Sequence, residues 1–197
     1  MRWGLFAILR ILSAISGLMA TNMNMLFVGD FFQHTYDTSR DGNVNQSLFN
    51  DRAAYEARFT SKGFVPDTTT LVNSWRCSRS VCEFVTKNLS ISICSNRGAD
   101  EDTDIAAISD PAQTALILND PNIVKLHYWR SSNFGPGHKN WGDTKGEDCY
   151  GDICVMLNKK SAKMHSQGKL CELPPATRNK LYVAITRAYG NVYLINE

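Results

Sequence analysis

TRNKLYVAITRAYGNVYLI, residues 177–195, predicts a helix that leads directly into a strand. Apolar residues recur at helical spacing through 177–188, and 191–195 follows as the closing strand. Upstream, ICVML at 153–157 is a continuous apolar run, which is typical of a strand buried on both faces. Short strands that alternate with helices in this way predict an α/β fold with a parallel sheet.

The rest of the chain extends the same alternation. We expect further strands at 23–28, 68–72 and 123–129, and helices at 51–61 and 78–89. The polar, glycine-rich or lysine-rich stretches at 37–50, 130–148 and 158–172 read as connections. We therefore expect one domain over 1–197, with a small insertion or loop at about 92–120.

Composition fits a soluble globular protein with a sizeable core. The 197 residues are 43% hydrophobic and 20% charged, and the formal net charge is +2. The net charge therefore does not by itself indicate a nucleic-acid-binding protein, although a protein with nearly balanced charges can still have a local basic groove.

Residues 1–20, MRWGLFAILRILSAISGLMA, superficially resemble a secretion signal. Arg10 interrupts the apolar run, and the residues before Thr21 make a poor cleavage site. The run is also too short and too charged to span a bilayer. We interpret it as an amphipathic core helix, with an export signal as the alternative, and expect a cytoplasmic protein that does not enter a membrane.

Six cysteines are present, and two pairs of them have C-x4-C spacing, Cys77/Cys82 and Cys149/Cys154. This spacing is looser than that of most zinc sites. Reduced, partly buried thiols in a cytosolic protein are the preferred interpretation, and four thiolates around zinc are the alternative. No metal site is predicted.

Residues 26–33, LFVGDFFQ, place a carboxylate and an amide after a predicted strand. Ligands of open α/β sheets bind at the carboxyl ends of the strands, where Asp30 and Gln33 would then lie. The amide of Gln33 both donates and accepts hydrogen bonds, so it can bind a phosphate oxygen or a water. The alternative is a simple Gly-Asp turn followed by a solvated glutamine.

Residues 71–78, LVNSWRCS, again lead from a predicted strand into a helix. Trp75 offers a flat ring on which an adenine can stack, and Arg76 offers a forked donor suited to phosphate. A core tryptophan beside a surface arginine is the alternative.

Two later segments add charged groups near predicted turns. In NWGDTKGE, residues 140–147, a Lys-Gly loop before a buried strand can meet a phosphate backbone or a nucleotide sugar. In KLYVAITRA, residues 180–188, Arg187 lies near the end of a helix that is otherwise apolar. Such a helix can direct one guanidinium across a domain interface, as an arginine finger does. The alternative is a helix-terminal arginine stabilised by the macrodipole.

In order and spacing, these four segments resemble motifs III, IV, V and VI of UvrD/Rep-like superfamily 1 DNA helicases, over roughly residues 1–195. GDFFQ is similar to the family's GDxxQ, and NSWRCS to its NYRS, with Trp75 in the tyrosine place. VAITRA is similar to VA(L/V)TRA almost letter for letter. NWGDTKGE resembles motif V, although its spacing to the next strand is one residue longer than the family's, around Cys149. The resemblance implies the second RecA-like domain of a helicase, a parallel sheet with helices on both faces.

The resemblance also implies roles for individual residues. Gln33 would couple nucleotide state to DNA, and Arg76 and Arg187 would touch the γ-phosphate. Trp75 would stack on adenine, and Glu147 would contact the ribose. The remaining residues of the expected site are Lys145, Asp30 and Tyr36 near the nucleotide, and Thr144, Trp141 and Phe31 near nucleic acid.

Two sequence elements that the family requires are not in the chain. The phosphate-binding Walker A loop, G-x-x-x-x-G-K-[ST], does not occur, and neither does the magnesium-binding DExxQ sequence. Because guanidinium groups assist phosphoryl transfer only when a phosphate is already positioned, we expect no ATP hydrolysis by this chain alone. ATP and magnesium are expected as cofactors only when a partner supplies the Walker A and B half.

Three functions are compatible with these features. The chain can be a helicase half that completes its ATP site with a Walker A domain from another chain or domain. It can instead be a non-enzymatic interaction protein, for example a phage or defence-related regulator or inhibitor of a nuclease or helicase complex. Thirdly, it can be a single-stranded DNA-binding module whose rings at Phe31, Tyr36 and Trp141 stack on bases.

Overall fold

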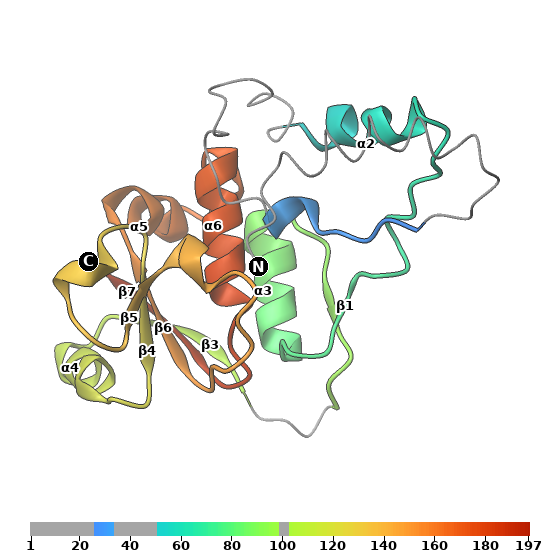
Figure 1. The fold of residues 1–197 in the computed structure, drawn as a ribbon. Helices are drawn as coiled ribbons and strands as arrows, with labels where there is room; N and C mark the ends of the chain where they lie inside the picture. Colours follow the sequence, from blue (N-terminus) through green and yellow to red (C-terminus); the bar gives the residue numbers. More distant parts are fainter. Residues whose placement is uncertain (1–25, 34–50, 99–102) are drawn as a thin grey trace. The chain divides into compact units, whose positions relative to one another are not determined.

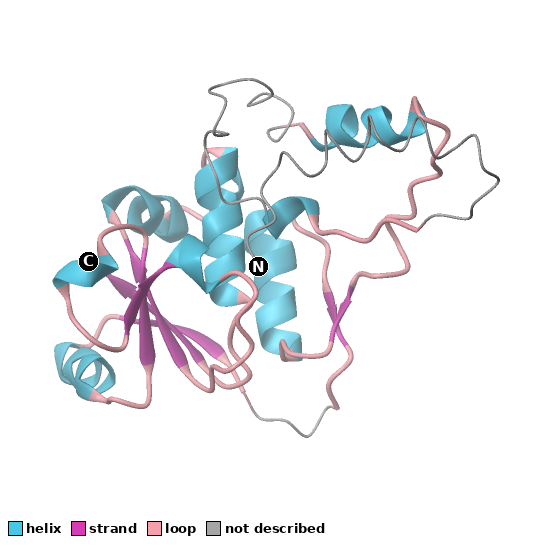
Figure 2. Ribbon diagram, in the orientation of Figure 1, coloured by secondary structure: helices cyan, strands magenta, loops and turns pink. Residues whose placement is uncertain are grey.

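The computed structural model describes residues 26–33, 51–98 and 103–197. The chain divides into two compact units, residues 1–67 and 68–197. Figures 1 and 2 show the ribbon coloured by sequence position and by secondary structure. The predicted helix at 1–20 and the candidate residue Tyr36 lie outside the described residues.

The first unit is held by aromatic contacts between a short turn and one helix. The turn is the 3-10 helix η2 (Phe31–Gln33), and the helix is α2 (Arg52–Thr60), whose first turn is capped by the Asp51 side chain. Phe31 lies 5.2 Å from the ring of Tyr55 in α2. The buried strand predicted at 23–28 is wrong for its described part, because residues 26–30 form neither helix nor strand and are exposed.

The second unit is built on a five-stranded, wholly parallel sheet in the order β3-β7-β6-β4-β5. The strands are β3 (Ile105–Ile108), β4 (Val124–His127), β5 (His138–Asn140), β6 (Ile153–Leu157) and β7 (Val192–Asn196). All five residues of the central strand β6 are buried, as its continuous apolar sequence predicts.

Helices cover both faces of this sheet. On one face, Ile117 of α4 (Pro111–Asn119) packs with Cys154 and Met156, whose side chains point the same way because strand residues alternate. Figure 1 shows α3 (Arg79–Leu89) and α6 (Pro175–Ile185) side by side on the opposite face. Helix α5 (Lys159–Ser166) joins α3 there through Phe84 and His165. The predicted α/β fold, a parallel sheet with helices on both faces, is therefore confirmed.

Short elements complete the second unit. Strand β1 (Asn73–Ser74) precedes α3, and β2 (Cys94–Ser95) follows it. The two strands pair in parallel over two residues. Three 3-10 turns lie in connections: η4 (Ser131–Asn133), η5 (Trp141–Thr144) and η6 (Leu170–Glu172). No helix of the described part is long and apolar enough to cross a membrane.

Several predicted connections hold regular structure instead. The loop or insertion expected at about 92–120 contains β2, β3 and α4, and β3 pairs with β7 in the main sheet. The lysine-rich connection at 158–172 contains α5, which begins at the side-chain cap of Asn158. The strand expected at 68–72 is replaced by β1, one residue further along the chain. In the first two cases, polar composition concealed short elements that pack within the second unit.

Candidate functional site

Arg76 is fixed by a tight turn between β1 and α3. The Ser74 hydroxyl accepts hydrogen bonds from the backbone N–H groups of Arg76 (3.2 Å) and Cys77 (3.0 Å). Ser78 then caps α3 by accepting from the backbone of Val81. This local chemistry holds the backbone at the helix entrance, from which the Arg76 side chain extends.

Arg187 lies just beyond the C-cap residue of α6, Thr186, and its side chain lies against that helix. Its Nε donates to the backbone carbonyl of Val183 at 3.1 Å, and its side chain is buried, with the residue only 4% exposed. A guanidinium here satisfies carbonyl groups at a helix C-terminus and complements the negative end of the macrodipole. These contacts differ from those of an arginine finger that projects from a surface, and they match the alternative stated for this residue.

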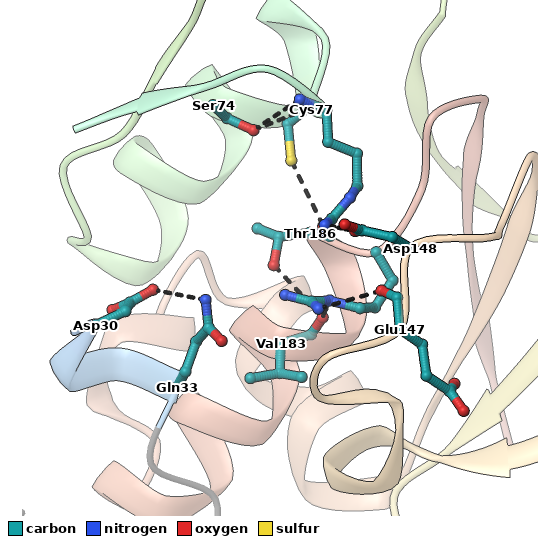
Figure 3. Close-up of polar contacts among 10 residues, drawn as sticks. Asp30, Gln33, Ser74, Cys77, Glu147, Asp148, Val183 and Thr186 are labelled. Carbon is teal, nitrogen blue, oxygen red and sulfur yellow. Dashed lines mark hydrogen bonds and ion pairs between the residues drawn. The ribbon is translucent and has the colours of Figure 1, made fainter. Parts of the chain in front are cut away.

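The two arginines, far apart in the sequence, meet at one loop. Arg76 donates from one terminal nitrogen to the carbonyl of Thr186 at 2.9 Å and pairs through the other with the carboxylate of Asp148. Arg187 donates to the backbone carbonyl of Glu147, the residue before Asp148, at 3.4 Å. Figure 3 shows Glu147 and Asp148 of this loop near Thr186 and Val183, whose carbonyl groups the two arginines also contact. The structure therefore brings together Arg76 and Arg187, which the sequence predicts to act together.

The cluster lies at the amino ends of two strands. An isolated bridge between Tyr150 and Ala188 joins the entries to β6 and β7, and Arg187 immediately precedes it. Ligands of open parallel sheets usually bind at the opposite edge, beyond the carboxyl ends of the strands. The arginine pair therefore does not lie where a single α/β domain usually binds its ligand.

Cys77 lies beside both arginines and is almost fully buried. Its pKa is lowered to about 7, mainly by a hydrogen bond with Cys82 and further by Ser74 and by the positive charges of Arg76 and Arg187, against the effect of burial. The pKa of Cys82 is raised, chiefly by its hydrogen bond to Cys77. Among the described residues, no three His, Cys, Asp or Glu side chains form a group that could hold a metal ion.

The carboxylate of Glu147 is engaged inside the second unit. Lys139 of β5 donates to its two oxygens at 2.9 and 3.0 Å, and the Tyr150 hydroxyl also donates to it. Burial opposes ionisation, but the hydrogen bonds from Tyr150 and Lys139 outweigh it and lower the pKa of Glu147. Interaction with Tyr150, and then the hydrogen bonds to Glu147, raise the pKa of Lys139. In this arrangement Glu147 anchors the loop, whereas the sequence predicts that it contacts a ribose.

Two of the three residues predicted to touch nucleic acid are buried. Trp141 is 0% exposed and donates from its indole nitrogen to the carbonyl of Leu126 at 2.9 Å. Thr144 is also 0% exposed and donates to the carbonyl of Trp141. A ring without exposed surface cannot stack on a base, so the prediction for Trp141 is wrong, and the Thr144 hydroxyl is likewise occupied. Lys145, next in sequence, is exposed.

Trp75 has the exposure that a stacking residue needs. It is 79% exposed, although a tryptophan in a core would lie among the most buried side chains. The expectation of a core tryptophan at this position is therefore wrong. Its ring belongs to the same turn as Arg76, directly before it.

The remaining candidates belong to the first unit. Asp30 accepts hydrogen bonds from the backbone of Phe32 at 2.9 Å and from the side chain of Gln33 at 3.1 Å. These contacts stabilise the η2 turn, as the Gly-Asp turn interpretation expects. Phe31 is half-buried and packs on Phe32 as well as on Tyr55.

Sequence reasoning missed Asp148, which provides the carboxylate that faces Arg76. Glu147 and Asp148 are adjacent acids after Gly146, and nothing in the letters KGED says which one turns towards the arginines. Gly146 adopts a φ of +83°, a left-handed conformation that glycine favours, and this turn sets the direction of both acids.

Neither a scan against models of protein families nor a search of curated proteins finds a match for this chain.

Proposed function

We propose that this chain is the second motor half of a superfamily 1 DNA helicase. In this proposal, Trp75 supplies a ring for adenine stacking, and Arg76 supplies a guanidinium for the γ-phosphate. The ATP site is completed by a Walker A domain from another chain or domain, which also brings magnesium. Single-stranded DNA is the proposed track.

The observation that carries the proposal is the meeting of Arg76 and Arg187 at one loop. Two like charges placed close together repel each other, and the repulsion grows where burial lowers the local dielectric. The carboxylate of Asp148 offsets this repulsion at Arg76 but is itself exposed, and guanidinium groups are well suited to bind a phosphate in its place. Arg187 would contribute its positive charge and would hold the loop that faces Arg76.

Trp75 and Arg76 are consecutive, so the turn that fixes one also fixes the other. An exposed aromatic ring beside a forked cation suits a ligand that has a flat base at one end and phosphates at the other. A nucleotide is the common ligand with both parts. The exposed position of Lys145 would allow an additional contact with a phosphate or with DNA.

A pull-down of the full chain from the cells that make it tests the proposal. We expect a partner with a Walker A loop, and ATP hydrolysis stimulated by single-stranded DNA when the two are mixed. Substitution of Arg76 by alanine should abolish that hydrolysis and leave the complex intact. The chain alone should release no phosphate above background. A turnover by the chain alone that disappears in Arg187→Ala would overturn the proposal.

The deep burial of Arg187 favours a second candidate function. A buried arginine bonded to backbone carbonyls can be a purely structural remnant. The chain would then be a non-enzymatic interaction protein that regulates or inhibits a nuclease or helicase complex. The same pull-down separates the two functions, because a partner without a Walker A loop supports the regulator and excludes the split motor.

A further inference from the structure

Asp148 and Glu147 are consecutive carboxylates with different roles. The Glu147 carboxylate is bound by Lys139 and Tyr150. The Asp148 carboxylate pairs with the terminal nitrogen of Arg76, and its side chain is 64% exposed. One acid therefore anchors the loop from within, while the other is exposed and pairs with Arg76; Figure 3 shows the two acids side by side.

The other two nitrogens of the Arg76 guanidinium face the protein. One donates to the carbonyl of Thr186 at 2.9 Å. The Nε atom is buried and has no hydrogen-bond partner among the described residues. The ring of Tyr189 lies 5.8 Å from the guanidinium carbon. With the Arg76 side chain only 19% exposed, the edge that faces Asp148 is the part that an incoming anion can reach.

We propose that Asp148 is a displaceable counter-ion, which an incoming phosphate must replace on Arg76. This inference rests on the proposed function, because it concerns how the same arginine accepts its ligand. Asp148 would compete for the guanidinium edge and set a threshold, so that weakly bound anions do not occupy it. A phosphate presented firmly by a partner domain would displace the carboxylate.

The exposure of Asp148 makes this exchange favourable. Ion pairs with a solvent-exposed carboxylate are weak, because water screens them and because ordering two side chains costs entropy. A phosphate group carries more charge and more acceptor oxygens than a carboxylate, and its pairing with arginine is correspondingly stronger. Arg187, whose guanidinium reaches the neighbouring carbonyl of Glu147, adds a second positive charge close by.

Titration with inorganic tripolyphosphate tests this competition in the full chain and needs no partner. The variant is Asp148→Asn, which keeps the shape of the side chain and removes its charge. Asp143→Asn is the matched control, because Asp143 is an exposed acid on the same loop that bonds to Asn140 instead of to Arg76. Asp148→Ser is a second variant, and the double variant Arg76→Gln/Asp148→Asn identifies the binding residue.

We expect Asp148→Asn and Asp148→Ser to bind tripolyphosphate about three- to tenfold more tightly than the unchanged chain, since a competing exposed ion pair is lost. Asp143→Asn should change the affinity less than twofold, roughly the effect of a distant screened charge. Adding Arg76→Gln should remove the gain.

Three results would overturn the inference: equal affinity with and without Asp148, an equal gain in Asp143→Asn, or no binding by any variant. None of them decides the proposed function, which is tested by ATP hydrolysis with a Walker A partner. That hydrolysis can be found while the titration shows no effect of Asp148. Conversely, the titration can show the exchange while no such partner is captured.

Discussion

Arg187 donates a hydrogen bond from its guanidinium to the backbone carbonyl of Glu147, and this side chain links the end of α6 to the loop that precedes β6. Its Nε bonds back to Val183 within the helix. The residue with the strongest resemblance to a helicase motif is therefore also part of the framework that holds the loop of Asp148.

Replacement of Arg187 by alanine should lower the free energy of unfolding by about 2–3 kcal/mol, because buried charge-assisted hydrogen bonds are lost. Urea denaturation measures the change. Arg187→Lys should lose less, since it keeps the charge. Arg79→Ala, at an exposed position at the start of α3, should change stability by less than about 0.5 kcal/mol. A loss in Arg187→Ala no larger than that of Arg79→Ala would contradict the framework role.

The exposed and buried tryptophans should respond in opposite ways. Trp75→Ala should leave the unfolding free energy within about 0.5 kcal/mol, because the ring is 79% exposed. Trp141→Ala should cost about 3–5 kcal/mol, since it empties a fully buried site and removes the hydrogen bond to Leu126. Denaturation curves of the two variants provide the comparison. A large loss in Trp75→Ala would show that its ring packs in a core and is not presented to a ligand.

Cys77 should make stability depend on pH in an alkaline range. Its pKa is lowered from 9.0 to about 7, first by the hydrogen bond with Cys82 and then by Ser74 and the two arginines. An acid with a lowered pKa in the folded state stabilises the fold above the unfolded pKa, and this stability is lost as pH falls through the folded pKa. The unfolding free energy should therefore rise between about pH 7 and pH 9. Cys77→Ser, measured under reducing conditions, should flatten that rise, and an unchanged slope would refute the assignment.

Gly190 should be intolerant of a side chain. A Cβ atom built at this position meets the carboxylate and backbone of Asp152, whose side chain also accepts from the backbone of Asn191 at 2.8 Å. Gly190→Ala should therefore cost about 1–3 kcal/mol through overpacking at the entries to β6 and β7. Gly151→Ala is the matched control, because nothing lies within 4 Å of its Cβ position. Thermal unfolding measures the stability of both variants. An equal loss of stability in the two would contradict the prediction.

The sequence predicts the centre of the sheet well. The strand at 153–157 has the predicted bounds, and the strand at 191–195 is displaced by one residue. Both are mainly apolar runs covered by helices on the faces of the sheet, so their pattern is clear. Helix α3 is equally well predicted from the sequence, because Ser78 caps it and its apolar residues share one face.

The edge of the sheet is harder to predict. Strand β3, IAAI, is short and lies among acidic residues, so its propensity is weak, and its pairing with β7 stabilises it. Helix α4 carried a usable signal, since Asp110 caps it and Pro111 occupies its first turn. The reverse error occurs at residues 26–28, whose apolar sequence predicts burial, whereas Leu26 is 88% exposed.

Within the candidate site, sequence spacing identifies the arginines but not the acid that meets them. Arg76 and Arg187 follow recognisable elements, and a resemblance to motifs places them together. The choice between Glu147 and Asp148 depends on the left-handed turn at Gly146 and on Lys139 from a different strand. Such three-dimensional pairings leave no trace in local periodicity, and the same holds for the burial of Thr144.

Single-turnover ATP hydrolysis by this chain assembled with a Walker A domain is the most direct measurement of the proposed motor role. We predict that Arg76→Ala slows the chemical step by about a thousandfold or more, as expected for a guanidinium that stabilises a phosphoryl transition state, with Asp143→Asn unchanged. Hydrolysis at the same rate in Arg76→Ala would contradict the account.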